Sequence, residues 1–398
     1  MKKKKLKNGM TVLHEHRNTD TVTVLVHVGT GSNNERPAVA GISHFLEHMI
    51  FEGTEKRTNT EISEAIENVG GEFNAATSNE KTYFYAKLPK KHFELGLEIL
   101  SDIIQNPKFE PKIFEKEKKV VLEEIKMVND QPLMYQWVLF EKTLFKKHPT
   151  KNPVYGNSKA VRESTTALMR SYYKQWYVPS NIVVSVVGNV KGVGGVVSKY
   201  FGGMKKGTKP VMKKVVEPAA LRKEEKRVKK KINQAYMILG YKTVHRMHPD
   251  SYVLDIISTI FHKGISGRIT NEIRVKRGLA YSAGTHNEAE KGFGHFSFYL
   301  NTEKKNVELC KRIILDEIQK LDDLGAKELR EAKEHLVGKQ LVGEEDTYRL
   351  AEDIAYWEFI GDAKLAKEYL KRLKKVTKKD IIRVRNKYLN DKYLLVLL

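Results

Sequence analysis

Two histidines and a glutamate in one short stretch, His44, Glu47 and His48, have the residue types and the spacing of a metal centre. Residues three and four positions apart lie on one face of an α-helix, so the three side chains would project from a single narrow arc. Two imidazoles one turn apart can bind the same Zn²⁺, and the carboxylate beside them can act as a general base on metal-bound water. The order H-x-x-E-H inverts the H-E-x-x-H zinc-binding pattern.

The helix that carries these residues is expected to be buried. Its other positions are apolar all round the helical wheel, namely Phe45, Leu46, Met49 and Ile50. Unpaired polar groups are costly in such surroundings, and a shared metal ion would satisfy them. The alternative is a pair of core histidines satisfied by hydrogen bonds alone.

A catalytic zinc needs a third protein ligand, commonly a histidine or a carboxylate from another element. Residues 111 to about 127 have helical periodicity, with an apolar stripe formed by Phe114, Val120, Val121 and Ile125. Glu117 and Glu124 lie within that stripe, two turns apart on one face, whereas Glu123 points away. Either inward carboxylate could be the ligand. The alternative is a helix edge from which both glutamates extend into water.

Two stretches closely resemble one family. The sequences G-I-S-H-F-L-E-H-M-I-F-E-G-T at residues 41–54 and E-K-K-V-V-L-E-E at residues 117–124 are similar to the pitrilysin, insulysin and mitochondrial processing peptidase family of zinc peptidases. The resemblance implies that Glu124 is the third zinc ligand and that Glu117 supports the site. It also implies that the chain hydrolyses peptide bonds.

The second half of the chain repeats the first. Residues 278–288, G-L-A-Y-S-A-G-T-H-N-E, parallel residues 71–80, and residues 296–309 parallel the stretch that follows Thr82. Self-similarity at a period of about 200 residues predicts two related α+β domains, each a mostly antiparallel sheet packed with helices. Within the first copy, residues 9–31 alternate in the manner of a hairpin.

The predicted division is a zinc-binding catalytic domain at residues 1–205, a linker at 206–221 and a homologous domain at 222–398. The linker is rich in lysine and contains glycine and proline. Where the second copy should carry the metal motif, near residues 254–261, it has D-I-I-S-T. One Zn²⁺ per chain is therefore expected.

The resemblance also identifies residues for substrate binding. Asn74, Ala75 and Ala76 match an edge strand that takes up an extended peptide by main-chain hydrogen bonds. Arg274 and Tyr281 match a pair that binds the substrate carbonyl. Without the family, Arg274 would be interpreted as a surface arginine and Tyr281 as a half-buried strand aromatic.

Composition limits the remaining possibilities. The 398 residues carry a net charge of +22, which raises nucleic acid and anionic membranes as partners. The lysines are scattered over most elements and no nucleic-acid motif accompanies them, so neither partner is expected. The single cysteine, Cys310, excludes an internal disulfide and lies in a helical pattern, as a packed, inert thiol. With no secretory signal or membrane span recognisable, a cytoplasmic location is expected.

The sequence thus predicts a zinc-dependent endopeptidase that acts on unstructured peptides. The alternative is a non-catalytic scaffold subunit of a related peptidase or respiratory-type complex; a nucleic-acid-binding role is a third, weaker option. With two domains the chain resembles the short members of the family, which close a chamber by pairing. A C₂ homodimer is expected, with a heterodimer of related chains as the other possibility.

Overall fold

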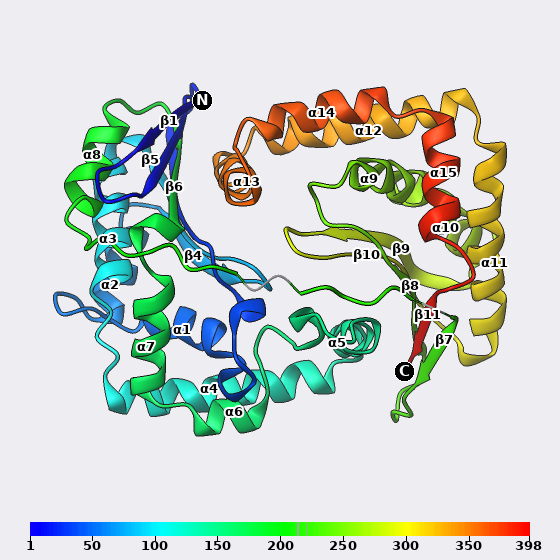
Figure 1. Cartoon of the computed structure of the whole chain (residues 1–398), viewed down its shortest axis with the longest axis horizontal. Helices are drawn as coiled ribbons and strands as arrows, with labels where there is room; N and C mark the ends of the chain where they lie inside the picture. The colour runs from blue at the N-terminus through cyan, green and yellow to red at the C-terminus, as the bar shows by residue number, and fades with distance from the viewer. Residues whose placement is uncertain (213–214, 221) are drawn as a thin grey trace. The chain divides into compact units, whose positions relative to one another are not determined.

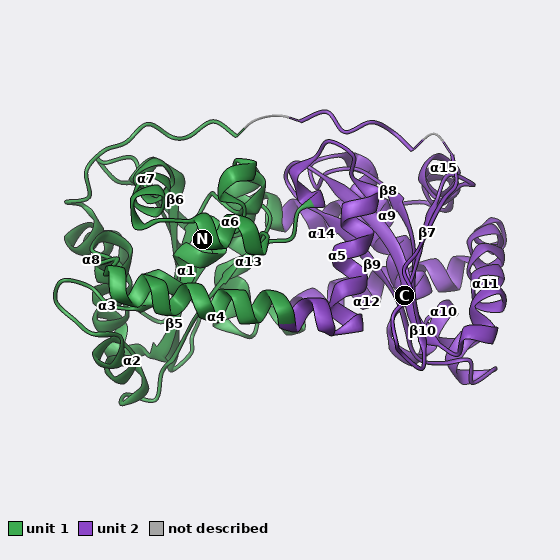
Figure 2. Ribbon diagram, turned by 90° about the horizontal axis from the view of Figure 1, so that it is seen from below, with its two compact units in different colours: residues 1–126, 152–213, 342–366 green, residues 127–151, 214–341, 367–398 purple. Residues whose placement is uncertain are grey.

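The computed structural model describes residues 1–212, 215–220 and 222–398, so positions 213, 214 and 221 of the predicted linker lie outside the described residues. The chain is an α+β protein with two compact units, and each unit contains one sheet (Figure 1). Unit 1 comprises residues 1–126, 152–213 and 342–366. Unit 2 comprises residues 127–151, 214–341 and 367–398, as the colours of Figure 2 show. The predicted fold class is confirmed.

The sheet of unit 1 has six strands in the order β1-β2-β6-β3-β5-β4. Their bounds are β1 Lys2–Lys5, β2 Thr11–Glu15, β3 Thr21–Val28, β4 Glu72–Thr77, β5 Thr82–Pro89 and β6 Ile182–Gly188. The pairing is antiparallel except between β2 and β6. The expected hairpin of residues 9–31 is wrong, because β6 pairs with both β2 and β3 and lies between them.

Helices cover both faces of this sheet. The main core lies on one face, beneath α1 Ile42–Phe51, α2 Asn59–Glu67, α3 Phe93–Gln105, α7 Thr166–Trp176 and α8 Val193–Phe201. On the opposite face, α13 Thr347–Ile360 packs Leu350 and Ile354 against Leu13 and Leu25. The central strand β3 is consequently buried over nearly its whole length, which explains its run of valine and leucine.

The sheet of unit 2 has five strands in the order β7-β11-β8-β10-β9. Their bounds are β7 Glu224–Arg227, β8 Ala235–Lys242, β9 Ala280–Ala289, β10 Gly294–Thr302 and β11 Leu394–Leu397. Helices α5 Pro132–Leu144 and α9 Pro249–Phe261 cover opposite faces (Figure 1). Successive residues of β9 show this: Thr285 hydrogen-bonds Ser258 of α9, and His286 contacts Trp137 of α5.

The two sheets have the same topology. We number the strands of each unit in chain order, β2 to β6 in unit 1 and β7 to β11 in unit 2. Across both sheets the order is then first, fifth, second, fourth and third strand. In both, the first and last of these strands form the parallel pair. The repeat inferred from sequence therefore corresponds to a duplicated fold. Helix α9 occupies the place of α1 after the second strand and contains neither histidine nor glutamate.

The compact units do not follow the linear division at residues 206–221. Residues 127–151, which contain α5, belong to unit 2, and residues 342–366, which contain α13, belong to unit 1. Each half of the sequence thus supplies the helix that covers the second face of the other half's sheet. The physical reason is that each sheet presents apolar side chains on both faces and both must be covered. The ranges 1–205 and 222–398 describe the sequence repeat rather than these units.

Candidate metal centre

The helix that bears the histidine motif, α1, starts at a point fixed by glycine and a carboxylate. Gly41 has φ +97°, and a Cβ there would lie 2.4 Å from the carbonyl oxygen of Tyr155. Glu35 accepts hydrogen bonds from the backbone N–H groups of Gly41, at 2.6 Å, and Ser43, at 2.8 Å. These bonds satisfy donors of the first helical turn, which have no partner within the helix. Burial raises the pKa of Glu35 to about 7 despite them.

The predicted burial of α1 is confirmed. Its apolar positions Phe45, Leu46, Met49 and Ile50 are buried in the core of unit 1. The side chains of His44 and His48 are 13% and 24% exposed, so one side of an otherwise buried helix carries the polar residues. Burial and the neighbouring His48 lower the pKa of His44 to about 4, which leaves this imidazole neutral near pH 7 and able to bind a metal.

The second helix of the site is α4, Pro111–Asp130. Phe114, Val121 and Ile125 are buried as predicted, and Glu117 is buried among them. Val120, by contrast, is 44% exposed and lies outside the stripe, because it is one position, about 100°, from Val121 on the wheel. Glu123 is exposed and pairs with Lys126, as its predicted outward position requires.

Three side chains from α1 and α4 converge. Nε2 of His44 and Nε2 of His48 lie 3.5 and 3.7 Å from Oε2 of Glu124. These three residues are the one group of possible metal ligands found among the described residues, with one donor atom of each within 4.8 Å of the others. Tetrahedral zinc with bonds of about 2.0–2.1 Å separates its ligand atoms by about 3.3 Å. The donor set and its spacing therefore fit a zinc ion.

Glu117 faces the same site from a second direction. Its Oε2 lies 3.4 Å from Nδ1 of His48, the ring nitrogen that does not face Glu124. A carboxylate behind a histidine ligand fixes the tautomer and orientation of the ring. The structure thus separates the two glutamates that helical spacing alone left equivalent.

Glu47 lies beside the histidines and is held by a residue that sequence reasoning missed. The hydroxyl of Thr77, at the end of β4, donates a hydrogen bond to Oε2 of Glu47. Burial raises the pKa of Glu47, whereas this hydrogen bond opposes the change. Strand alternation puts Thr77 on the same side as Ala75, but it does not indicate that this side faces α1.

The strand proposed to bind peptide, β4, is at the edge of its sheet. Asn74, Ala75 and Ala76 pair with residues of β5 on one side. On its other side β4 has no strand partner among the residues the structure describes. The main-chain groups of a free edge can pair with an added strand.

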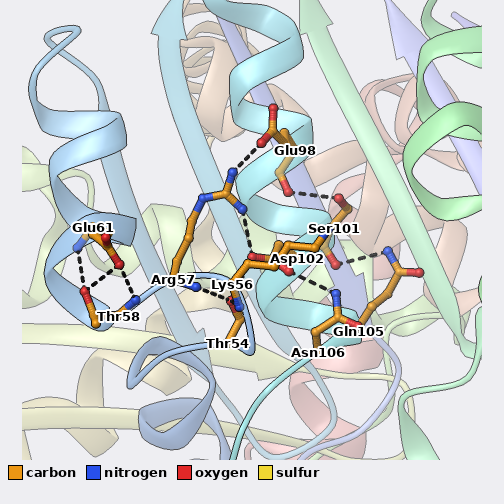
Figure 3. A network of polar contacts seen from close by, with 10 residues as sticks. All are labelled: Thr54, Lys56, Arg57, Thr58, Glu61, Glu98, Ser101, Asp102, Gln105 and Asn106. Carbon is orange, nitrogen blue, oxygen red and sulfur yellow. Dashed lines mark hydrogen bonds and ion pairs between the residues drawn. The ribbon is translucent and has the colours of Figure 1, made fainter.

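A polar network anchors the loop that follows α1 (Figure 3). Asp102 of α3 accepts hydrogen bonds from Thr54 at 2.8 Å, from Arg57 at 2.9 Å and from Asn106 at 2.9 Å. Burial alone would raise the pKa of Asp102, but these bonds hold it below its ordinary value. The loop leads into the capping box of Thr58 and Glu61 that begins α2. The connection between α1 and α2 is therefore fixed to the core.

The side chains of Arg274 and Tyr281 are in contact within unit 2. Arg274 belongs to a π-helix, Asn271–Val275, and its guanidinium carbon lies 5.1 Å from the centre of the Tyr281 ring. Tyr281, at the start of β9, is 80% exposed, so the interpretation as a half-buried aromatic is wrong. A stacked guanidinium and phenol on the surface form a pair of hydrogen-bond donors.

A buried H-x-x-E-H helix, two carboxylates from a second helix and a duplicated α+β fold define the zinc-metallopeptidase class. Residues 11–158 match the family model described as insulinase, peptidase family M16, and residues 165–336 match the peptidase M16 inactive domain. The chain belongs to the M16 peptidase family, which confirms the resemblance stated from sequence.

Curated relatives span most of the chain. A Rickettsia felis protein named as an uncharacterized zinc protease is 32% identical over 389 residues, covering 96% of this chain and 93% of the relative. The Bacillus subtilis zinc protease YmxG, also named uncharacterized, is 31% identical over 344 residues, covering 85% and 83%. These names support assignment of the chain to the zinc metalloproteases.

Solved structures have the same fold. A protease from Helicobacter pylori superimposes with a TM-score of 0.94 at 25% identity, covering 100% of this chain and 98% of that one. A chain of complex III₂ from Candida albicans has a TM-score of 0.84 at 17% identity, covering 100% and 94%. Among the described residues, none of the helices combines the length and the hydrophobicity that a membrane-spanning segment requires.

Proposed function

We propose that the protein is a zinc-dependent endopeptidase that hydrolyses unstructured peptides. The observation that carries this proposal is the convergence of His44, His48 and Glu124 beside the carboxylate of Glu47. One ion per chain is proposed, since the described residues contain one such group. When bound, the zinc would act as a Lewis acid toward the peptide carbonyl and make water more acidic.

Protein side chains carry out the proton transfer and orient the groups of the site. Glu47 takes a proton from the attacking water and returns it to the leaving amine, as a general base and then a general acid. Thr77 holds that carboxylate toward the site. Glu117 keeps the His48 ring in the orientation that directs Nε2 toward Glu124.

Substrate binding is proposed at two places. Asn74, Ala75 and Ala76 on the edge strand β4 would pair with an extended peptide, which explains a preference for unstructured substrates. Arg274 and Tyr281 would donate hydrogen bonds to the oxyanion that develops at the substrate carbonyl.

The proposal also includes an oligomeric state and a cellular location. We propose a homodimer, with a heterodimer of related chains as the alternative. Light scattering of the purified chain that gave a stable monomeric mass would contradict the homodimer. No nucleic-acid or membrane partner is proposed. A cytoplasmic location is proposed from cysteine usage, since the only cysteine of the sequence, Cys310, is a buried free thiol.

A non-catalytic scaffold is the second candidate function. It is favoured by the match of residues 165–336 to a domain described as inactive. The zinc ligands, however, lie in the region that matches the insulinase model, and all three are present and close together. The enzyme is therefore the better-supported function.

Digestion of a peptide library by the purified full-length chain, with and without a chelator, tests the proposal. We expect internal cleavage that the chelator abolishes and added Zn²⁺ restores. Metal analysis should give about one zinc per chain. A chain with no zinc and no cleavage would instead support the scaffold.

A further inference from the structure

A hollow of about 650 Å³ opens beside the metal centre within unit 1. Glu47 and His48 line it on the side of α1, and Phe73 and Asn74 line it on the side of the edge strand β4. Its walls therefore include both the proposed general base and the proposed peptide-binding strand. A side chain of a peptide paired with β4 would have this space available next to the bond being cleaved.

The charge of the hollow is opposite to that of the chain. Five lining residues are glutamates: Glu47, Glu52, Glu67, Glu72 and Glu117. No lysine or arginine is among the described residues that line it, although the sequence has a net charge of +22. The lysine recorded in ion pairs with the lining glutamates is Lys116, which is 62% exposed and lies 3.9 Å from Glu52 and 3.6 Å from Glu117. Against five carboxylates, one exposed lysine and one Zn²⁺ leave a net negative charge.

The same hollow has an aromatic part. The rings of Phe51 and Phe73 are 4.9 Å apart, and Tyr85 of β5 also lines the space. Lysine and arginine bury their aliphatic stems against apolar surface and keep the cationic head at a polar rim, where aromatic faces attract it as well. An acidic side chain would be repelled here, and a purely apolar one would leave the carboxylates without a counterion.

We propose that this hollow, which we call the acidic pocket, receives a lysine or arginine side chain adjacent to the cleaved peptide bond. The inference rests on the proposed peptidase function and specifies its substrate class. Within the acidic pocket, Glu67 and Glu72 are exposed and lie outside the catalytic machinery, so they are the residues that select charge. Peptides that differ only at that position should be distinguished by charge.

The test uses three otherwise identical peptides with lysine, leucine or glutamate next to the cleaved bond. Wild-type protein should cleave the lysine peptide about tenfold more efficiently in kcat/KM than the leucine peptide, and the glutamate peptide least efficiently, because several partly exposed ion pairs act together. In the double variant Glu67→Gln/Glu72→Gln, the preference for lysine over leucine should fall severalfold.

A matched control removes the same charge elsewhere in unit 1. Glu55 and Glu64 are exposed and do not line the acidic pocket, so Glu55→Gln/Glu64→Gln should keep the wild-type preference. Equal loss in both double variants, or cleavage of all three peptides without regard to charge, would overturn the inference while leaving the peptidase function intact. Failure to cleave any peptide by zinc-loaded wild-type protein would remove the proposed function and the inference with it.

Discussion

Nδ1 of His48 lies 3.4 Å from Oε2 of Glu117, and Nε2 of the same ring lies 3.7 Å from Oε2 of Glu124. A single imidazole therefore connects the two carboxylates of α4, and each carboxylate faces a different ring nitrogen. With the Nδ1 proton directed to Glu117, the lone pair of Nε2 faces the position between the ligands. This arrangement gives the two glutamates different positions around the His48 ring, which helical spacing alone could not assign.

The first prediction concerns Glu117. Glu117→Gln should weaken zinc binding about 10- to 100-fold, because the amide is a poorer acceptor for the His48 N–H. Competition with a chelator of known affinity measures this directly. Glu115→Gln is the matched control, since Glu115 is an exposed residue of the same helix that pairs with Lys118. Unchanged zinc affinity in Glu117→Gln would assign Glu117 to packing alone.

A second prediction separates proton transfer from metal binding. Glu47→Gln should lower kcat by at least about 10²- to 10⁴-fold, the usual contribution of a general base. Zinc content should remain near one per chain, because Glu47 is not among the three converging ligands. Cleavage at the wild-type rate would show that another group acts as the base.

The hydroxyl of Thr77 provides a third test. Thr77→Val keeps the shape of the side chain and removes the donor to Glu47, so kcat should fall about tenfold, the value of one hydrogen bond to a charged group. KM should change little. Thr77→Ser restores the hydroxyl and should restore kcat. If the serine variant were as impaired as the valine variant, Thr77 would serve the packing of β4 rather than the position of Glu47.

Tyr281 allows the oxyanion proposal to be tested without disturbing the stacked pair. Tyr281→Phe retains the ring beneath Arg274 and removes only the phenolic hydroxyl. A lost oxyanion donor should lower kcat about a hundredfold while KM changes little. Because Tyr281 is exposed, thermal unfolding should be unaffected. Wild-type turnover in this variant would exclude the hydroxyl from catalysis.

The Asp102 network predicts a pH-dependent stability of unit 1. The folded pKa of Asp102 is lowered, so its contribution is complete above the unfolded value of about 3.9 and is lost as the pH falls through the folded value. Asp102→Asn should reduce the free energy of unfolding by about 2 kcal/mol at pH 7, through weakened bonds to Arg57 and Thr54. Urea unfolding should show that this difference shrinks below about pH 4. A difference independent of pH would mean that the carboxylate charge is irrelevant.

The parts of the site that were predictable are those whose signal is local. Helical spacing places His44 and His48 together, and the apolar stripe of α4 correctly turns Glu117 and Glu124 inward and Glu123 outward. The duplicated strands were visible because both copies retain similar residues in similar order. Fold class and candidate ligands therefore follow from short-range periodicity and internal repetition.

The features that were missed depend on contacts between residues distant in sequence. Strand β6 enters between β2 and β3 from more than 150 residues away, and nothing in the alternation of residues 9–31 indicates it. The hydrogen bond from Thr77 to Glu47 likewise joins two elements whose relative placement no local pattern specifies. The position of α13 on the sheet of unit 1 is a third case, since its apolar face could equally have covered the sheet of its own half.

That placement of α13 has a consequence for biosynthesis. All the proposed zinc ligands lie within the first 124 residues, yet the sheet beneath them lacks the cover of one face until residues 342–366 have left the ribosome. A nascent chain would carry exposed valine and leucine throughout translation of the intervening segment. The proposed peptide hydrolysis is therefore disfavoured in a nascent chain that still lacks α13.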